Sequence, residues 1–161
     1  MKPKVEVVWF KRDLRVYDHA PLSLAASRSP IIPLYIFEPE LWRQKDMSYR
    51  HYLFLKSSLV DLDKQLLSLG SSLVIKVGNA DDIFQDLCSN HEITNISSHQ
   101  ETWNLWTYNR DLKVRQWAKS VNVRWHETPN NGIVRNLKNR SGWAKNWYYS
   151  MSQPITTAPK K

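Results

Sequence analysis

Short apolar runs alternate with amphipathic segments along this chain of 161 residues. The apolar runs are rich in β-branched and aromatic residues, and they predict strands at residues 5–10, 31–37, 72–77, 93–97 and 121–126. The segments between them predict helices at residues 20–27, 48–69, 80–89 and 104–119. The run at residues 31–37 is apolar at consecutive positions, which is typical of a strand covered on both faces.

The segment 48–69 gives the clearest helical pattern. Its leucines recur at intervals of three and four residues and form one apolar stripe: Leu55, Leu59, Leu62, Leu66 and Leu69. Ser48 is a suitable N-cap, and Gly70 stands where a left-handed residue ends many helices. Asn79 is the expected cap of the helix at residues 80–89.

The helix expected at residues 104–119 has a less regular pattern. Its apolar positions predict an inward face made of Leu105, Tyr108, Leu112 and Trp117.

The strict alternation of strands and helices indicates an α/β fold. Right-handed crossovers favour a Rossmann-like five-stranded parallel sheet of order 3-2-1-4-5, with helices on both faces. Ligands of such sheets bind outside the carboxyl ends of the strands, where the strand order reverses. That crevice lies between the loops at residues 11–19 and 97–103, with Glu38 beside the first loop.

The first of these loops is rich in charge and lacks glycine. Arg12, Asp13, Arg15 and Asp18 alternate in sign and predict a lattice of ion pairs that orients the loop. His19, His99 and His126 are interpreted as isolated histidines. Without glycine, the loop lacks the close backbone approach that a dinucleotide-binding motif needs, and the chain has no phosphate-loop, nucleophile-elbow or His-x-x-x-His motif. The single cysteine excludes a disulfide framework within the chain.

The net charge of +8 is unevenly distributed. Residues 1–101 carry 12 Lys and Arg against 13 Asp and Glu, whereas residues 102–161 carry 11 against 2. The basic part is compatible with a nucleic-acid or acidic partner, and equally with solubility and a charged tail. No apolar run reaches the roughly 20 residues that a membrane helix needs, and no secretory signal follows Met1, so we expect a cytoplasmic protein without a membrane partner.

Residues 7–19, VVWFKRDLRVYDH, resemble the opening of the DNA photolyase/cryptochrome family. That family typically continues a hydrophobic strand with Trp-Phe-Arg-x-Asp-Leu-Arg-x-x-Asp-Asn; Lys11 replaces the first arginine here, and His19 the asparagine. Further blocks are similar in the same order: residues 53–63, 98–102, 106–111 and 131–135. The similarity covers residues 4–150.

This resemblance implies an N-terminal α/β antenna domain at residues 1–150. The antenna chromophore of the family is a folate, deazaflavin, flavin or lumazine. Residues 151–161 would be an interdomain linker or a frayed tail, and the helical FAD-binding domain, which also binds damaged DNA in the family, is absent. The implied function is antenna binding in a light-driven DNA-repair photolyase (deoxyribodipyrimidine photolyase type), not repair-competent alone. The alternative is a scaffold domain of a cryptochrome blue-light photoreceptor.

The resemblance also implies a set of ligand-binding residues at the crevice. Glu38, Met47 and Arg50 would form one wall. Glu101, Trp106 and Arg110 would form the other, with Trp106 either at the pocket or in the core. Arg12 and Asp13 belong to the loop between the walls. No catalytic or metal-binding residue is expected.

Overall fold

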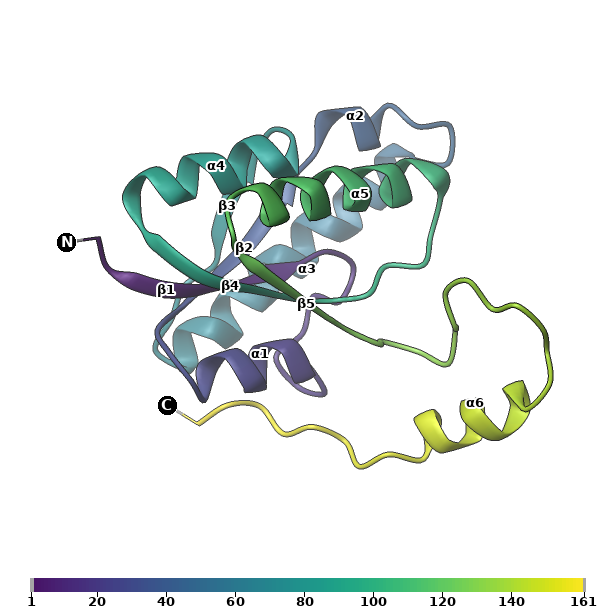
Figure 1. The fold of residues 1–161 in the computed structure, drawn as a ribbon. Helices are drawn as coiled ribbons and strands as arrows, with labels where there is room; N and C mark the ends of the chain where they lie inside the picture. The colour runs from purple at the N-terminus through teal and green to yellow at the C-terminus, as the bar shows by residue number, and fades with distance from the viewer. Residues whose placement is uncertain (1, 161) are drawn as a thin grey trace.

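The computed structural model describes residues 2–160 and consists of one parallel sheet with helices on both sides (Figure 1). Met1 and Lys161 lie outside the described residues. The elements in chain order are β1 (Lys4–Phe10), α1 (Ala20–Ala26), β2 (Ile31–Phe37), α2 (Pro39–Trp42), α3 (Tyr49–Ser68), β3 (Val74–Val77), α4 (Ala80–Asn90), β4 (Glu92–His99), α5 (Leu105–Ser120), β5 (Arg124–Thr128) and α6 (Trp143–Met151).

The sheet has the order β3-β2-β1-β4-β5, and all of its pairings are parallel. The predicted fold class and strand order are therefore confirmed. Val8 of β1 is opposite Pro33 on one side and Ser97 on the other, so β1 is the central strand. The strand order reverses between β1 and β4, which places the crevice predicted from the sequence at their carboxyl ends.

Successive residues of β1 enter two separate hydrophobic cores. Val7 and Trp9 pack with α4 and α5, whereas Val8 and Phe10 pack with α1 and α3. Val7, Val8 and Phe10 are fully buried. A strand with helices on both faces has no solvent side, which explains why β1 is apolar from Val7 to Phe10. Its one buried charged residue, Glu6, pairs with Arg28 and accepts a hydrogen bond from the Ser97 hydroxyl.

Helix α3 forms as the leucine spacing predicts. Leu55, Leu59, Leu62 and Leu66 are its buried residues. The Ser48 side chain accepts a hydrogen bond from the His51 backbone N–H. At the other end, the Gly70 N–H donates to Leu67 O and the Ser71 N–H donates to Leu66 O. This pair of bonds is a Schellman motif, and it requires the positive φ of 84° that Gly70 adopts.

The predicted inward face of α5 is wrong. Leu105, Tyr108 and Leu112 are exposed, and the buried residues are instead Thr107, Arg110, Asp111, Val114 and Ala118. Only Trp117 of the predicted face packs against the core, where its ring stacks on Phe84 at a centroid distance of 5.5 Å. The buried stripe is displaced around the helix because its first half covers charged groups rather than apolar ones.

Two strand predictions are displaced, and two helices were missed. β3 begins at Val74 rather than residue 72, and β5 occupies residues 124–128 rather than 121–126. The second shift arises because α5 runs to Ser120 and the chain then turns at Asn122, whose φ is 58°. Helix α2 is a single turn after β2, and α6 forms within the basic aromatic stretch after β5. Asn79 occupies the N-cap position of α4, but its side chain donates to Asp82 instead of capping the backbone.

The C-terminal segment returns to the body of the domain after α6 (Figure 1). The Asp18 N–H donates to Thr156 O at 2.8 Å, the Ser23 hydroxyl donates to Thr157 O at 2.8 Å, and Ala158 packs on the core beneath α3. This part of the tail is docked rather than frayed; its role as an interdomain linker stays a prediction. Across residues 2–160, no helix combines the length and apolarity needed to span a bilayer.

Candidate functional site

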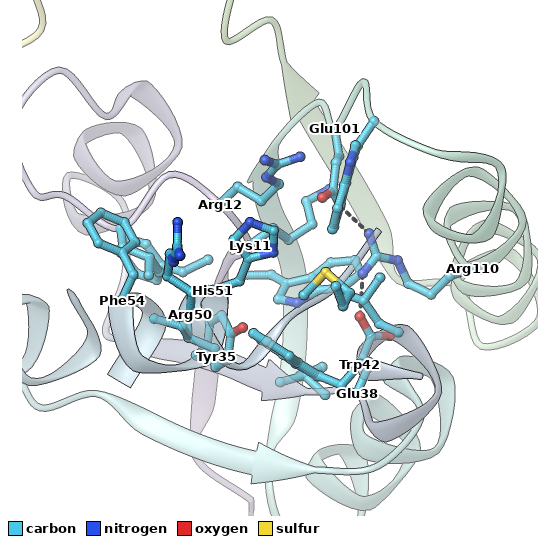
Figure 2. A pocket seen from close by; sticks show the side chains of 18 residues that line it. Lys11, Arg12, Tyr35, Glu38, Trp42, Arg50, His51, Phe54, Glu101 and Arg110 are labelled. Atoms are coloured by element: carbon cyan, nitrogen blue, oxygen red, sulfur yellow. Dashed lines mark hydrogen bonds and ion pairs between the residues drawn. The ribbon is translucent and has the colours of Figure 1, made fainter. Parts of the chain in front are cut away.

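A cavity of about 440 Å³ opens at the carboxyl edge of β1 and β2, beneath α2 and the start of α3 (Figure 2). Six of the predicted site residues line it: Arg12, Glu38, Met47, Arg50, Glu101 and Arg110. The cavity thus has the two walls expected from the sequence, one formed by residues after β2 and the other by residues after β4. Asp13 and Trp106 do not belong to this lining.

The walls of the cavity are mainly aromatic and apolar. They are formed by Trp9, Phe10, Leu14, Tyr35, Ile36, Leu41, Trp42, Phe54, Leu55 and Trp103. Trp42 is fixed by stacking on Phe37 at 5.3 Å with an interplanar angle of 6°. Because Pro39 starts α2 directly after β2, this single turn brings Trp42 over the end of the strand. Such a cavity, within the range of about 300–1,000 Å³ common for small-molecule sites, suits a flat ring.

Arg110 joins the two walls through a buried ion network. Its Nη1 lies 2.5 Å from Glu38 Oε2, its Nη2 pairs with Glu101 Oε2, and its Nε lies 2.9 Å from Asp111 Oδ1. Figure 2 shows the guanidinium between Glu38 and Glu101. The face of the guanidinium also lies 4.7 Å from the Trp9 ring centroid. Three carboxylates raise the pKa of Arg110, so this group remains charged although it is buried.

Glu38 has one oxygen in the network and one outside it. Its Oε2 accepts from Arg110, whereas Oε1 is buried and has no hydrogen-bond partner among residues 2–160. Burial raises the pKa of Glu38 to about 7, and the attraction of Arg110 offsets only part of this effect. A buried carboxylate oxygen without a partner is costly, and Glu38 is one of the residues that line the cavity. Glu38 is therefore equipped to accept a hydrogen bond from a ligand.

Lys11 is a second buried polar group with spare hydrogen-bonding capacity. Within the described chain its Nζ forms no hydrogen bond, and the nearest carboxylate oxygen of its ion pair, Asp111 Oδ2, is 3.8 Å away. The ammonium lies 4.7 Å from the Trp9 ring centroid and 5.5 Å from that of Trp125. Burial lowers the pKa of Lys11, against the opposing attraction of Asp111. The sequence interpretation missed Lys11 as a lining residue, although its place directly after the central strand marked the edge of the sheet.

The ion-pair lattice predicted in the first loop forms only in part. Arg15 pairs with Asp18 at 3.8 Å, but Arg12 and Asp13 do not join it. The interpretation of His19 and His99 as isolated is wrong: Asp13 Oδ2 lies 2.9 Å from His19 Nε2 and 2.6 Å from His99 Nδ1, while Asp13 Oδ1 accepts the Lys11 backbone N–H. These hydrogen bonds hold the pKa of Asp13 well below its usual range. Arg12 instead stacks on Trp103, with its guanidinium carbon 4.0 Å from the ring centroid. This half of the lattice fails because loop closure buries Asp13 and leaves Arg12 at the surface.

The cluster of Asp13, His19 and His99 has the residue types of a metal site, with its ligand atoms within 4.8 Å of one another. However, His19 Nδ1 accepts the Leu22 N–H at 3.1 Å, which caps α1. The proton of the neutral ring is then on Nε2, facing Asp13, and no lone pair remains there for a metal ion. The hydrogen bonds of the cluster therefore favour a structural role, fixing the loop that carries Lys11 and Arg12.

Comparison with known proteins identifies the family. A sequence profile described as DNA photolyase matches residues 6–145. The chain belongs to the DNA photolyase family. Cryptochrome DASH of Gloeobacter violaceus is 31% identical over 131 residues, and the match covers 77% of this chain and 26% of that protein. A deoxyribodipyrimidine photo-lyase of Buchnera aphidicola is 27% identical, with coverages of 59% and 21%.

The fold is shared with solved members of this photolyase and cryptochrome group. An archaeal photolyase from Sulfolobus tokodaii, described with two FAD molecules, superposes with a TM-score of 0.77 at 20% identity. The superposition covers 98% of this chain and 37% of the archaeal one. This chain thus spans about a quarter of the length of the curated relatives it matches, and it corresponds to their N-terminal α/β domain.

Proposed function

We propose that the 440 Å³ cavity binds a planar heteroaromatic antenna chromophore, and that this domain serves a light-driven DNA-repair photolyase. The observation that carries the proposal is that Glu38, a lining residue of the aromatic cavity, has one buried carboxylate oxygen, Oε1, without a partner in the described chain. Folates, deazaflavins, flavins and lumazines all carry ring N–H and C=O groups on a flat body. The ring N–H satisfies Glu38, and the apolar walls cover the ring faces.

The rest of the site complements such a ring. Lys11 supplies a donor for a ring carbonyl, and Arg50 supplies another at the start of α3. Trp42, fixed on Phe37, offers a flat surface for stacking. Arg110 holds Glu38 and Glu101 in place, so the site is organised before the ligand enters. A bound antenna chromophore absorbs near-ultraviolet or blue light and passes the excitation to a flavin.

In this proposal, residues 1–150 form the antenna domain and the tail from residue 151 leads to a helical FAD-binding domain of the same parent chain. The parent protein binds damaged DNA and repairs it in light, and this domain alone does not. Scaffolding in a cryptochrome photoreceptor is the second candidate, because the matched relatives include cryptochromes as well as a photolyase. Light-dependent repair of pyrimidine dimers by the full-length parent separates the two: repair supports the photolyase role, and its absence supports the scaffold.

The antenna proposal is tested by titrating the chain with a folate, a deazaflavin, FMN and a ribityl-lumazine, followed by absorption and fluorescence. We expect saturable binding of at least one, weakened about tenfold by Glu38→Gln. This variant keeps an oxygen for Arg110 but presents an N–H where Oε1 faces the ligand. Glu40→Gln is the matched control, because Glu40 is exposed, pairs with Arg43 and does not line the cavity. Absence of binding by all four compounds overturns the proposal.

A further inference from the structure

A second, smaller cavity adjoins the first one at the point where the strand order reverses. Its volume is about 150 Å³, and it lies between the loops that follow β1, β4 and β5. It shares four lining residues with the larger cavity: Lys11, Arg12, Glu101 and Trp103. The two cavities therefore adjoin at these side chains, so a group attached to a ligand in the first cavity is a candidate occupant of the second.

The lining of the small cavity is polar, in contrast to the aromatic walls of the first. Gln100, Thr102, Asn130 and Asn131 contribute hydroxyl and amide groups. Within this group, Asn131 Oδ1 accepts the Ile133 N–H at 2.9 Å, which fixes the amide, and its Nδ2 lies 3.4 Å from the Thr102 hydroxyl, a long contact that leaves an N–H of the amide for a ligand. An apolar ring would leave these hydroxyl and amide groups without hydrogen bonds, whereas a hydrophilic chain can bond to them.

The hydrogen-bonding groups that remain free in the small cavity include two cations. The lowered pKa of Asp13 keeps this carboxylate anionic, but its Oδ2 lies against His19 and His99 and its Oδ1 accepts the Lys11 backbone N–H, while Glu101 pairs with Arg110. The Arg12 guanidinium has no salt bridge to any residue in 2–160, and Lys11 Nζ forms no hydrogen bond in the same range. Stacking on Trp103 holds the Arg12 guanidinium plane in one orientation, so little rotational freedom is lost on binding.

We propose that this small cavity binds a phosphate monoester at the end of the polyol side chain of the ring ligand. The inference rests on the antenna proposal and narrows it to chromophores of the ribityl-phosphate type. A phosphate offers three strong acceptor oxygens and about two negative charges. Arg12 can meet two of the oxygens with its fork of N–H groups, and Asn131 supplies a donor from another side, while the Lys11 ammonium, which donates to the ring, adds its positive charge. A neutral ribityl chain can hydrogen-bond to the amide groups of this cavity, but it gains no charge attraction from its two cations.

The test compares riboflavin with FMN, which have the same ring and differ by the phosphate. Binding is measured by quenching of flavin fluorescence at low and at high salt. We expect FMN to bind about tenfold more tightly at low salt, with the ratio shrinking as salt rises. Arg12→Gln reduces the ratio to near one, and Arg12→Lys retains part of it. Arg43→Gln is the matched control, since it removes an exposed arginine outside both cavities.

A ring-free ligand separates failure of this inference from failure of the antenna proposal. Ribose 5-phosphate at millimolar concentration is followed by the NMR signals of the Asn130 and Asn131 side-chain amides and the Trp103 indole. Shifts that saturate, and that Arg12→Gln abolishes, support the phosphate site even where neither flavin binds. Equal affinities for riboflavin and FMN overturn the phosphate site and leave the ring site standing. Absence of ribose 5-phosphate shifts, with neither flavin binding, also overturns it.

Discussion

Helices α3 and α5 cover opposite faces of the same sheet but bury different chemistry. α3 buries four leucines against β1 and β2. α5 buries Arg110 and Asp111 in its first half, followed by Val114 and Ala118 in its second. Both helices border the cavity, but they meet it with different groups: α5 through Arg110 of the ion network, and α3 through its first two turns, which include Leu55 of the leucine stripe. The contrast therefore follows from the buried charges, because a helix face that carries them leaves its apolar residues on the outside.

Replacing Arg110 is expected to give the largest loss in the free energy of unfolding among the variants that test this contrast. Arg110→Met keeps the length of the side chain but leaves Glu38, Glu101 and Asp111 buried near one another without their common partner. Removing one member of a buried ionic network costs about 3–5 kcal/mol. We expect urea unfolding at pH 8 to show a loss of this size, with a smaller loss at pH 5, where the carboxylates take up protons more readily.

The matched control is Arg115→Met on the same helix. Arg115 is more than half exposed and pairs with Glu127, so we expect a loss below about 1 kcal/mol. Equal losses in the two variants would show that the Arg110 network contributes no more than a surface ion pair.

Shortening a leucine of α3 tests the other side of the comparison. Leu62→Ala removes a fully buried side chain from the core between α3 and the sheet. We expect a loss of about 3 kcal/mol in the free energy of unfolding, with little dependence on pH, because no titratable group loses its partner. Leu67→Ala on the exposed face of the same helix should cost under about 1 kcal/mol. A marked pH dependence for Leu62→Ala would contradict the separation of the two regions.

The raised pKa of Glu38 gives the site a pH dependence that the leucine core lacks. The value of about 7 in the folded chain lies above the usual value of 4.5, so between these pH values the folded state holds a proton that the unfolded chain releases. Glu38 therefore lowers stability as the pH rises from about 4.5 to about 7. Glu38→Gln removes this effect, and we expect its stability relative to the wild type to increase by about 2–3 kcal/mol from pH 5 to pH 8.

Urea unfolding of both proteins at the two pH values measures this difference. Glu40→Gln serves again as the control, since Glu40 is exposed and should show no comparable change. A constant difference between Glu38→Gln and the wild type would contradict the raised pKa.

The sequence predicted well those parts of the fold in which burial of apolar groups decides the structure. The strand order, the leucine stripe of α3 and its Ser48 and Gly70 ends all formed as expected. The strand order and the helix ends depend on periodicity and topology, which are visible in the order of residues. Topology also located the crevice, and six of the eight site residues that the family resemblance implied line the cavity there.

The remaining features depend on partners distant in sequence. Asp13 meets His99 across 86 positions, and Arg110 meets Glu38 across 72, so neither pairing has a local signal. The charges near Asp13 suggested nearby ion pairs, but closure of the loop buried Asp13 and turned Arg12 onto Trp103. The resemblance implied Trp106 either at the pocket or in the core, and its ring lies outside the lining of the main cavity, with the centroid 5.9 Å from the Arg110 guanidinium carbon. The two side chains leave α5 in different directions, which places Arg110 in the cavity lining and Trp106 outside it.

The smallest expected effect concerns an apolar residue that periodicity placed inside α5. Leu105 is 73% exposed at the first position of the helix. Leu105→Gln replaces it with a polar residue of similar size and helix propensity, and we expect the free energy of unfolding to change by less than about 0.5 kcal/mol. Val114→Ala, at a fully buried position on the same helix, should cost more because it leaves a cavity in the core. A larger loss for Leu105→Gln than for Val114→Ala would mean that the helix is rotated from the orientation seen here. The Arg110 network could not then form, because the buried stripe carrying Val114 also carries Arg110 and Asp111.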